Sequence, residues 1–270
     1  MDFLEYWGLE EKAFENTGDP KFFYYSPVHK EALVRLIYVV RENKAGALLA
    51  GGYGTGKTTI ANELLAEIEE TEGYKSVYIS NPLLDSDELL QEIARQLGLR
   101  EDNLPRLKLR QFIETSLGDT ASENRHTVII IDEAHLISNK NVLEELRLLM
   151  NLQAGNQFLS TIIMMGQLEL RDAINSMPQF KQRFAIFYVL KNLGRDDSMK
   201  YIQHRLKVAG AQREIFSEKA STLIYKSSGG RPRQINNICD MSLLVGSMRK
   251  VKQIDEDIVR GVAKDLGEEI

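Results

Sequence analysis

Residues 51–58 read Gly51-Gly52-Tyr53-Gly54-Thr55-Gly56-Lys57-Thr58, which fits the pattern G-x-x-x-x-G-K-[ST] of a phosphate-binding loop. Glycines let the backbone fold into a nest whose N–H groups face an anion. Lys57 is expected to reach the β- and γ-phosphates of a nucleotide, and the Thr58 hydroxyl to bind Mg²⁺. The loop therefore predicts a nucleotide site.

The sequence on both sides of the loop supports this interpretation. Residues 47–50 form a short apolar run that is typical of a buried strand, and residues 59–65 continue as an amphipathic helix. Strand, loop and helix in this order are the context that the motif requires. The alternative is a glycine-rich turn that carries a lysine by chance. Such a turn would not be expected between a buried strand and an amphipathic helix.

An acidic pair, Asp132-Glu133, ends the β-branched run at residues 127–131. A parallel strand directs its carboxyl end at the crevice where ligands bind. We expect Asp132 in the Mg²⁺ shell and Glu133 beside the attacking water, which favours a hydrolase over a kinase. The alternative is an acidic turn that caps the next helix. The residues expected to bind nucleotide and metal are Gly51, Gly52, Tyr53, Gly54, Thr55, Gly56, Lys57, Thr58, Thr59 and Asp132.

The pattern along the chain predicts an α/β fold followed by helices. Strands are expected at residues 47–50, 75–80, 127–131, 161–165 and 185–190, and helices at 87–97, 106–117 and 141–152. This alternation predicts a parallel sheet with helices on both faces. Beyond residue 194 the strand signals stop. Helices are expected from Asp196/Asp197, Ser217, Pro232 and Asp255 onward, with the domain boundary near residue 194.

Four more polar residues are candidates for the site. Gln167 follows a predicted strand and can lie between the γ-phosphate and water, or simply cap the next helix. Asn81 can hold Glu133 inactive, or be a plain turn residue. Arg233 can move onto the γ-phosphate with the helical region, and Arg183 can enter a neighbouring subunit's site as an arginine finger. Taken alone, each arginine is most simply a surface residue.

Composition excludes several classes of protein. The 270 residues carry a net charge of −5, so no strong global field attracts nucleic acid or anionic lipid. The basic stretch at residues 100–110 is more typical of a solvated helix face than of a nucleic-acid-binding site. The single cysteine, Cys239, permits no internal disulfide and is expected in the core of a protein from a reducing cytosol. We expect no signal peptide and no membrane span.

Phrases in the leader and in the last third of the chain narrow the family. They are Tyr6-Trp7-Gly8-Leu9, Phe22–Ser26, His29–Leu33, Leu143–Leu152, Gly166–Leu170, Tyr201–Leu206 and Gly229–Asn236. With the P-loop and the acidic pair, they make the chain resemble an AAA+ ATPase of the ExeA/GspA secretion-pathway family over nearly its whole length. Long members of that family continue into a membrane helix and a periplasmic peptidoglycan-binding region.

The resemblance implies roles by position. Lys57 and Thr58 belong to Walker A, Asp132 and Glu133 to Walker B. Gln167 would be sensor 1, Arg233 sensor 2 and Arg183 the finger, with the leader around Phe23–Ser26 near adenine. The implied fold is a P-loop αβα sandwich with strand order 5-1-4-3-2 and a helical lid. This divides the chain into an ATPase core with its leader at residues 1–194 and a lid at residues 195–270.

The resemblance also implies a function. We expect a cytoplasmic, Mg²⁺-dependent ATPase that forms a homo-oligomeric ring or filament. It would drive or gate assembly of a secretion or pilus system through a membrane-embedded partner at the inner membrane. Related ATPases select targets for transposition, so a DNA-binding ATPase is the alternative, which the charge does not favour. A third reading is a nucleotide sensor that hydrolyses ATP negligibly, against which Glu133 weighs.

Overall fold

The computed structural model describes residues 3–268. Contacts divide the chain into two compact units. The sheet unit comprises residues 31–52 and 60–190, and the helical unit comprises residues up to 30, residues 53–59 and residues from 191 onward. The leader therefore groups by contacts with the C-terminal helices, while the functional division near residue 194 remains a prediction.

The sheet unit is built on a five-stranded sheet in the order β2-β3-β6-β1-β7, with every neighbouring pair parallel. Numbering these strands by their place in the chain gives 5-1-4-3-2, which confirms the predicted order. The strands are β1 (Gly46–Gly51), β2 (Tyr74–Ile79), β3 (His126–Ile131), β6 (Ser160–Gly166) and β7 (Ile186–Leu190).

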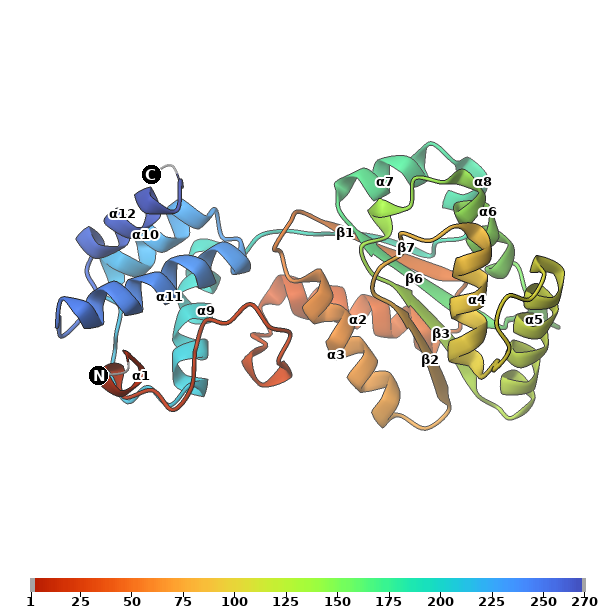
Figure 1. Ribbon diagram of the computed structural model, residues 1–270, viewed down its shortest axis with the longest axis horizontal. Helices are drawn as coiled ribbons and strands as arrows, with labels where there is room; N and C mark the ends of the chain where they lie inside the picture. Colours follow the sequence, from red (N-terminus) through yellow and green to blue (C-terminus); the bar gives the residue numbers. More distant parts are fainter. Residues whose placement is uncertain (1–2, 269–270) are drawn as a thin grey trace. The chain divides into compact units, whose positions relative to one another are not determined.

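The three central strands, β1, β3 and β6, are buried along their whole length because helices cover both faces of the sheet. Figure 1 shows α2 and α3 on one side and α4 to α8 on the other. The helices are α2 (Pro27–Arg41), α3 (Lys57–Glu70), α4 (Ser86–Leu97), α5 (Arg106–Ser122), α6 (Lys140–Leu149), α7 (Leu168–Asn175) and α8 (Pro178–Lys181).

Two helices of the helical unit have the caps that the sequence predicts, whereas the helix expected from Asp196/Asp197 has Gly194 as its N-cap residue and no side-chain cap. Side chains of Ser217 and Asp255 cap two of its helices by accepting hydrogen bonds from the backbone N–H groups of Ala220 and Ile258. Cys239 is fully buried, as expected. The helical segments are α1 (Phe3–Trp7), the 3₁₀ turn η1 (Pro20–Phe22), α9 (Arg195–Val208), α10 (Glu218–Ser228), α11 (Pro232–Met248) and α12 (Glu256–Asp265).

The leader is anchored to α11 through Trp7. Its indole N–H donates to the carbonyl of Leu243 at 2.8 Å, and its side chain is 2 % exposed. A Cβ at Gly246 would lie 2.8 Å from the Trp7 ring, so a glycine is needed for this close approach. Trp7, Phe14 and Phe22 thus join the hydrophobic core of the C-terminal helices.

One predicted helix is shorter than expected. The pattern predicts a helix over residues 141–152, but α6 ends at Leu149. The chain then forms a hairpin of β4 (Gln153–Ala154) and β5 (Gln157–Phe158). Gly155 sits in the turn with φ of +61°, a conformation that suits glycine. Among residues 3–268, no helix is both long and apolar enough to cross a membrane.

Candidate functional site

The P-loop has the predicted strand–loop–helix form. Strand β1 ends at Gly51 and α3 starts at Lys57. Gly54 and Gly56 have φ angles of +72° and +100°, which other residues rarely adopt. The backbone therefore requires glycine at positions 54 and 56. The first turn of α3 supplies N–H groups and a positive dipole end, as anion binding needs.

Arg233 contacts the tip of this loop within the helical unit. Its guanidinium lies over the Tyr53 ring, with Cζ 4.6 Å from the ring centroid, and Nη1 donates to the Tyr53 hydroxyl. The Arg233 N–H donates to the carbonyl of Gly54 at 3.3 Å. A Cβ at Gly54 would lie 2.9 Å from that of Arg233. The start of α11 thus packs directly on residues 53 and 54.

The leader and the loop enclose a small cavity. Its volume is about 50 Å³. It is lined by Phe22, Phe23 and Tyr24 from the leader, by Gly56 and Thr59, and by buried Arg205 and its neighbours on α9 and α11. Aromatic rings beside a phosphate-binding loop are suited to a nucleobase. The cavity is too small to hold a base as it stands, and the expectation that the leader lies near adenine remains a prediction.

The acidic pair follows β3 at the carboxyl edge of the sheet. Asp132 is 2 % exposed, and its Oδ1 accepts the N–H of Glu133 at 2.8 Å. The Tyr78 hydroxyl lies 3.4 Å from Asp132 Oδ2, and burial, with the nearby Asp132 charge, raises the pKa of Tyr78 to about 12. Tyr78 is therefore a protonated neighbour that can donate to the carboxylate at any ordinary pH.

Glu133 has an uncommon backbone conformation, with φ of +48° and ψ of +30°. It precedes the 3₁₀ turn η2 (Ala134–Leu136), and its Oε2 lies 3.3 Å from His135 Nδ1. That pair is close in distance but not aligned as a hydrogen bond, since Nδ1 has no hydrogen-bond partner among the described residues. A strained, half-exposed carboxylate beside a histidine is a typical arrangement of a functional site.

Gln167 lies at the end of β6 next to the same turn. It is the N-cap residue of α7 but makes no side-chain capping bond. Its Nε2 lies 2.9 Å from His135 Nε2, so the amide N–H donates to an unprotonated ring nitrogen. A Cβ at the preceding Gly166 would lie 2.9 Å from the His135 backbone nitrogen. These contacts therefore bring Gln167, His135 and Glu133 together. The Gln167 side chain does not make the hydrogen bond to the backbone of α7 that a helix cap would make.

Two other arginines singled out by the sequence, Arg231 and Arg183, have different surroundings. Arg231 lies next to Pro232 and bonds the Ser228 carbonyl and Glu268, at 3.0 and 3.3 Å. Arg183 follows α8 and precedes β7, and its Nε is buried with no hydrogen-bond partner within residues 3–268. Of the two arginines in the motif Gly230–Arg233, only Arg233 contacts the P-loop among the described residues.

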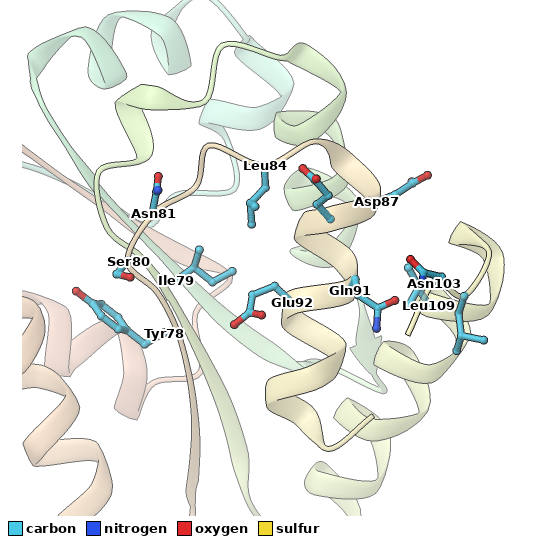
Figure 2. Close-up of a pocket in the computed structure, with 12 residues that line it drawn as sticks. Tyr78, Ile79, Ser80, Asn81, Leu84, Asp87, Gln91, Glu92, Asn103 and Leu109 are labelled. Atoms are coloured by element: carbon cyan, nitrogen blue, oxygen red, sulfur yellow. The ribbon is translucent and has the colours of Figure 1, made fainter. Parts of the chain in front are cut away.

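A larger cavity of about 440 Å³ lies beside β2 and α4 (Figure 2). Asn81 is on its rim and forms a turn, with Oδ1 accepting the Leu83 N–H at 3.2 Å. Asp87 pairs with Arg106, and Arg110 makes a two-bond contact with the buried Glu145. The basic stretch at residues 100–110 is thus partly neutralised by acidic groups of the same unit.

Sequence reasoning missed three residues near the candidate site, namely His29 as a contact of the P-loop, Tyr78 and His135. The partners of His29 and Tyr78 are 26 and 54 positions away in the chain, so no local pattern signals them. His135 stands two residues after Glu133, and a search for polar residues behind the acidic pair would have found it.

Comparisons with known proteins agree with this architecture. The family model described as "AAA domain" matches residues 40–174. General secretion pathway protein A of Aeromonas hydrophila is 36 % identical over 252 residues, which cover 92 % of this chain and 45 % of that protein. The resemblance predicted from the sequence is confirmed. The chain spans less than half the length of that relative.

Solved structures support the fold alone, because their sequence identity is low. The Aeropyrum pernix ORC2 protein superposes with a TM-score of 0.71 at 17 % identity, covering 94 % of this chain and 71 % of that chain. Cdc6p of Pyrobaculum aerophilum gives a TM-score of 0.70 at 19 % identity, covering 92 % and 70 %. The predicted fold class, a parallel α/β P-loop fold with C-terminal helices, is therefore correct.

Proposed function

Because the chain belongs to the AAA domain family, we propose that it binds ATP with Mg²⁺ and hydrolyses it to ADP and phosphate. One observation carries this proposal. The P-loop continues β1 and the acidic pair ends β3 in one parallel sheet, where Ala50 is level with Gly166 and Ile131 with Met164. The ends of these strands therefore share the edge at which α/β proteins bind ligands.

Each residue of the site has a distinct task in this reaction. Lys57 holds the β- and γ-phosphates, and the N–H groups of the loop surround them. Glu133 accepts a proton from the attacking water as general base. Gln167 orients that water or the γ-phosphate, and its amide is itself oriented by His135 at 2.9 Å.

The residues present fit a magnesium ion. Mg²⁺ prefers oxygen ligands and is usually bound by one or two protein groups together with phosphates and water. Thr58 offers an exposed hydroxyl at the start of α3, and Asp132 offers a buried carboxylate whose orientation is fixed by Glu133 N–H and Tyr78. When bound, the ion would neutralise charge that develops on the phosphate oxygens.

The two arginines are proposed to act on the γ-phosphate from different chains. Arg233 already lies on the P-loop residues Tyr53 and Gly54, which supports a role in its own subunit's site. Arg183 is a half-buried residue between α8 and β7 on the sheet unit, and its proposed role towards a second copy rests on the family resemblance. The ATPase would then be active as a homo-oligomeric ring or filament.

The biological task proposed for this activity is assembly of a secretion or type IV pilus-like system. It rests on the similarity to general secretion pathway protein A, of which the chain spans 45 %. The protein would act in the cytoplasm and reach the inner membrane through a membrane-embedded partner.

Calorimetric titration of ATP with Mg²⁺ tests the nucleotide site. Lys57→Ala removes the cation that faces the phosphates, so binding should be abolished. Lys30→Ala, an exposed lysine of the same unit, is the matched control and should bind as the wild type does. Unchanged affinity in Lys57→Ala would remove the P-loop assignment.

DNA binding is expected to be weak, because Arg106 and Arg110 pair with Asp87 and Glu145 and the net charge is −5. Fluorescence anisotropy with duplex DNA and ATP, at two salt concentrations, measures it. Tight binding that falls steeply with salt and stimulates hydrolysis would instead support a DNA-binding ATPase of transposition.

A further inference from the structure

His29 is a buried histidine that connects the leader to the P-loop. It lies in the first turn of α2 and is 4 % exposed. Its Nε2 lies 2.8 Å from the carbonyl oxygen of Thr55, and its Nδ1 lies 2.6 Å from the hydroxyl of Ser26. Ser26 is itself fully buried, and the Phe23 ring packs edge-on against the imidazole at 5.9 Å.

The partners of His29 fix its tautomer. A carbonyl oxygen can only accept, so Nε2 must carry the hydrogen and donate to Thr55. In a neutral ring Nδ1 is then an acceptor, and the Ser26 hydroxyl donates to it. Burial lowers the pKa of His29, which keeps the ring neutral near pH 7. The chain Ser26–His29–Thr55 is therefore a directed pair of hydrogen bonds that ends on the P-loop backbone.

The loop is shaped to receive this ring. A Cβ at Gly56 would lie 2.8 Å from His29 Nε2, and Gly56 has φ of +100°. Only glycine meets both conditions. His29 also lines the cavity that the leader encloses with Gly56 and Thr59. One side chain thus touches both the loop that would hold phosphates and the wall proposed for the base.

We propose that His29 is a positioning residue that holds the P-loop backbone at Thr55–Gly56 in its phosphate-binding shape and couples it to the leader. This inference rests on the proposed function, since it assumes that the loop binds ATP. The physical reason is that a buried hydrogen bond from His29 fixes the direction of the Thr55 carbonyl, and losing the bond removes that constraint. Without the bond from His29, the loop would lose the conformation in which its N–H groups converge.

Two substitutions separate the hydrogen bond from the bulk of the ring. His29→Phe keeps an aromatic ring of similar size but cannot donate to Thr55. We expect ATP–Mg²⁺ affinity in calorimetry to fall by about 10- to 100-fold, or about 1.4–2.8 kcal/mol. His29→Gln carries an amide N–H that can reach the same carbonyl, so it should restore affinity to within about 3-fold of the wild type. Thermal unfolding without nucleotide should show that both variants fold.

If His29→Phe does not fold, a third variant and an NMR spectrum of the wild type still test the inference. Ser26→Ala removes the donor to Nδ1 and should weaken ATP binding by about 3- to 10-fold. In the wild type, ¹⁵N resonances of the imidazole should show a neutral ring protonated at Nε2, with and without ATP. A ring protonated at Nδ1 would contradict the tautomer and the inference with it.

The outcomes distinguish this inference from the proposed function. If Lys57→Ala binds ATP normally, the proposed function fails and the inference fails with it. If Lys57→Ala abolishes binding while folded His29→Phe binds like the wild type, only the role of His29 is wrong. Equal losses in His29→Phe and His29→Gln would also overturn it, because the bond and not the ring is held responsible.

Discussion

Two histidines, one at each edge of the sheet, contact their neighbours in different ways. At the amino edge, His126 Nε2 donates to the Thr161 hydroxyl at 2.8 Å, and that hydroxyl donates to the Lys44 carbonyl at 2.7 Å. Each of these groups is matched, and His126 is only 8 % exposed. A buried and satisfied chain of this kind stabilises the fold and leaves no group available for chemistry.

At the carboxyl edge, the polar side chains of Glu133 and His135 lie close together, but not all of their hydrogen-bonding atoms have partners among the described residues. Glu133 has a left-handed backbone, and His135 Nδ1 lies near its carboxylate without an aligned hydrogen bond. Strain and unmatched groups persist where function requires them. Thr127 Oγ1 and Ser160 Oγ at the amino edge are also buried without a partner within residues 3–268, so the contrast between the edges lies in their histidines and in the Glu133 backbone.

Arg183 also lies at the amino edge of the sheet. The N–H of Ala185 donates to the Gly46 carbonyl at 2.9 Å, so the segment after Arg183 lies beside the start of β1, at the amino edge. Yet its Nε is buried and unpartnered among the described residues. The finger hypothesis requires the exposed part of this half-buried side chain to face a second chain.

The largest expected effect is therefore at Arg183. Arg183→Ala should keep ATP affinity, because the P-loop still holds the phosphates, and lower the hydrolysis rate by about 10³–10⁵-fold. Steady-state hydrolysis with calorimetric binding measures both. Arg171→Ala, an exposed arginine paired with Asp172, is the control and should hydrolyse normally. Normal activity in Arg183→Ala would return Arg183 to a structural role.

A smaller loss is expected at the carboxyl edge. Glu133→Gln keeps the shape of the side chain but removes the base, so single-turnover hydrolysis should fall by about 10²–10⁴-fold while ATP stays bound. Glu144→Gln, which alters only an exposed pair with Arg147, should hydrolyse at the wild-type rate. A wild-type rate in Glu133→Gln would place the base elsewhere and remove the chemical role proposed for this edge.

The smallest effect concerns stability at the amino edge. Burial lowers the pKa of His126 to about 4, while an unfolded histidine titrates near 6.5. Its contribution is fully present above pH 6.5 and is lost as pH falls towards 4, because only the unfolded chain takes up the proton. Relative to His126→Asn, the wild type should lose about 3 kcal/mol of unfolding free energy over that window.

Denaturant unfolding at several pH values measures this difference. The wild-type and His126→Asn curves should converge as the pH falls, whereas other groups titrate alike in both proteins. Curves that stay parallel from pH 7 to pH 4 would mean that His126 is not a neutral, buried member of the amino edge.

Much of the fold could be predicted because its signals are local. The glycines of residues 51–56 and the caps Ser217 and Asp255 act within a few residues of the backbone they fix. The three central strands are short, mainly apolar runs that are buried along their whole length. The helix predicted to Leu152 ends earlier, at Leu149, because the two-residue turn Gly155-Asn156 pairs the residues on either side of it as a hairpin.

The contacts of the site could not be predicted in the same way. The approach of Arg233 to Tyr53, and of Tyr78 to Asp132, joins residues that only the complete fold brings together. The sequence motifs identified Arg233 and Asp132 as site candidates. They contained no information on which side chains would contact these two residues. The same holds for Arg183, whose missing partner is visible only when the surrounding atoms are known.

The central claim is a nucleotide site completed by Arg183 of a second chain, and mixing two inactive variants tests it most directly. Arg183→Ala retains a sound P-loop, and Lys57→Ala retains a sound Arg183. We predict that the mixture hydrolyses ATP while each variant alone does not, and that wild-type specific activity rises with protein concentration. No recovery in the mixture, together with a wild-type specific activity that is constant down to a proven monomer, would contradict the account.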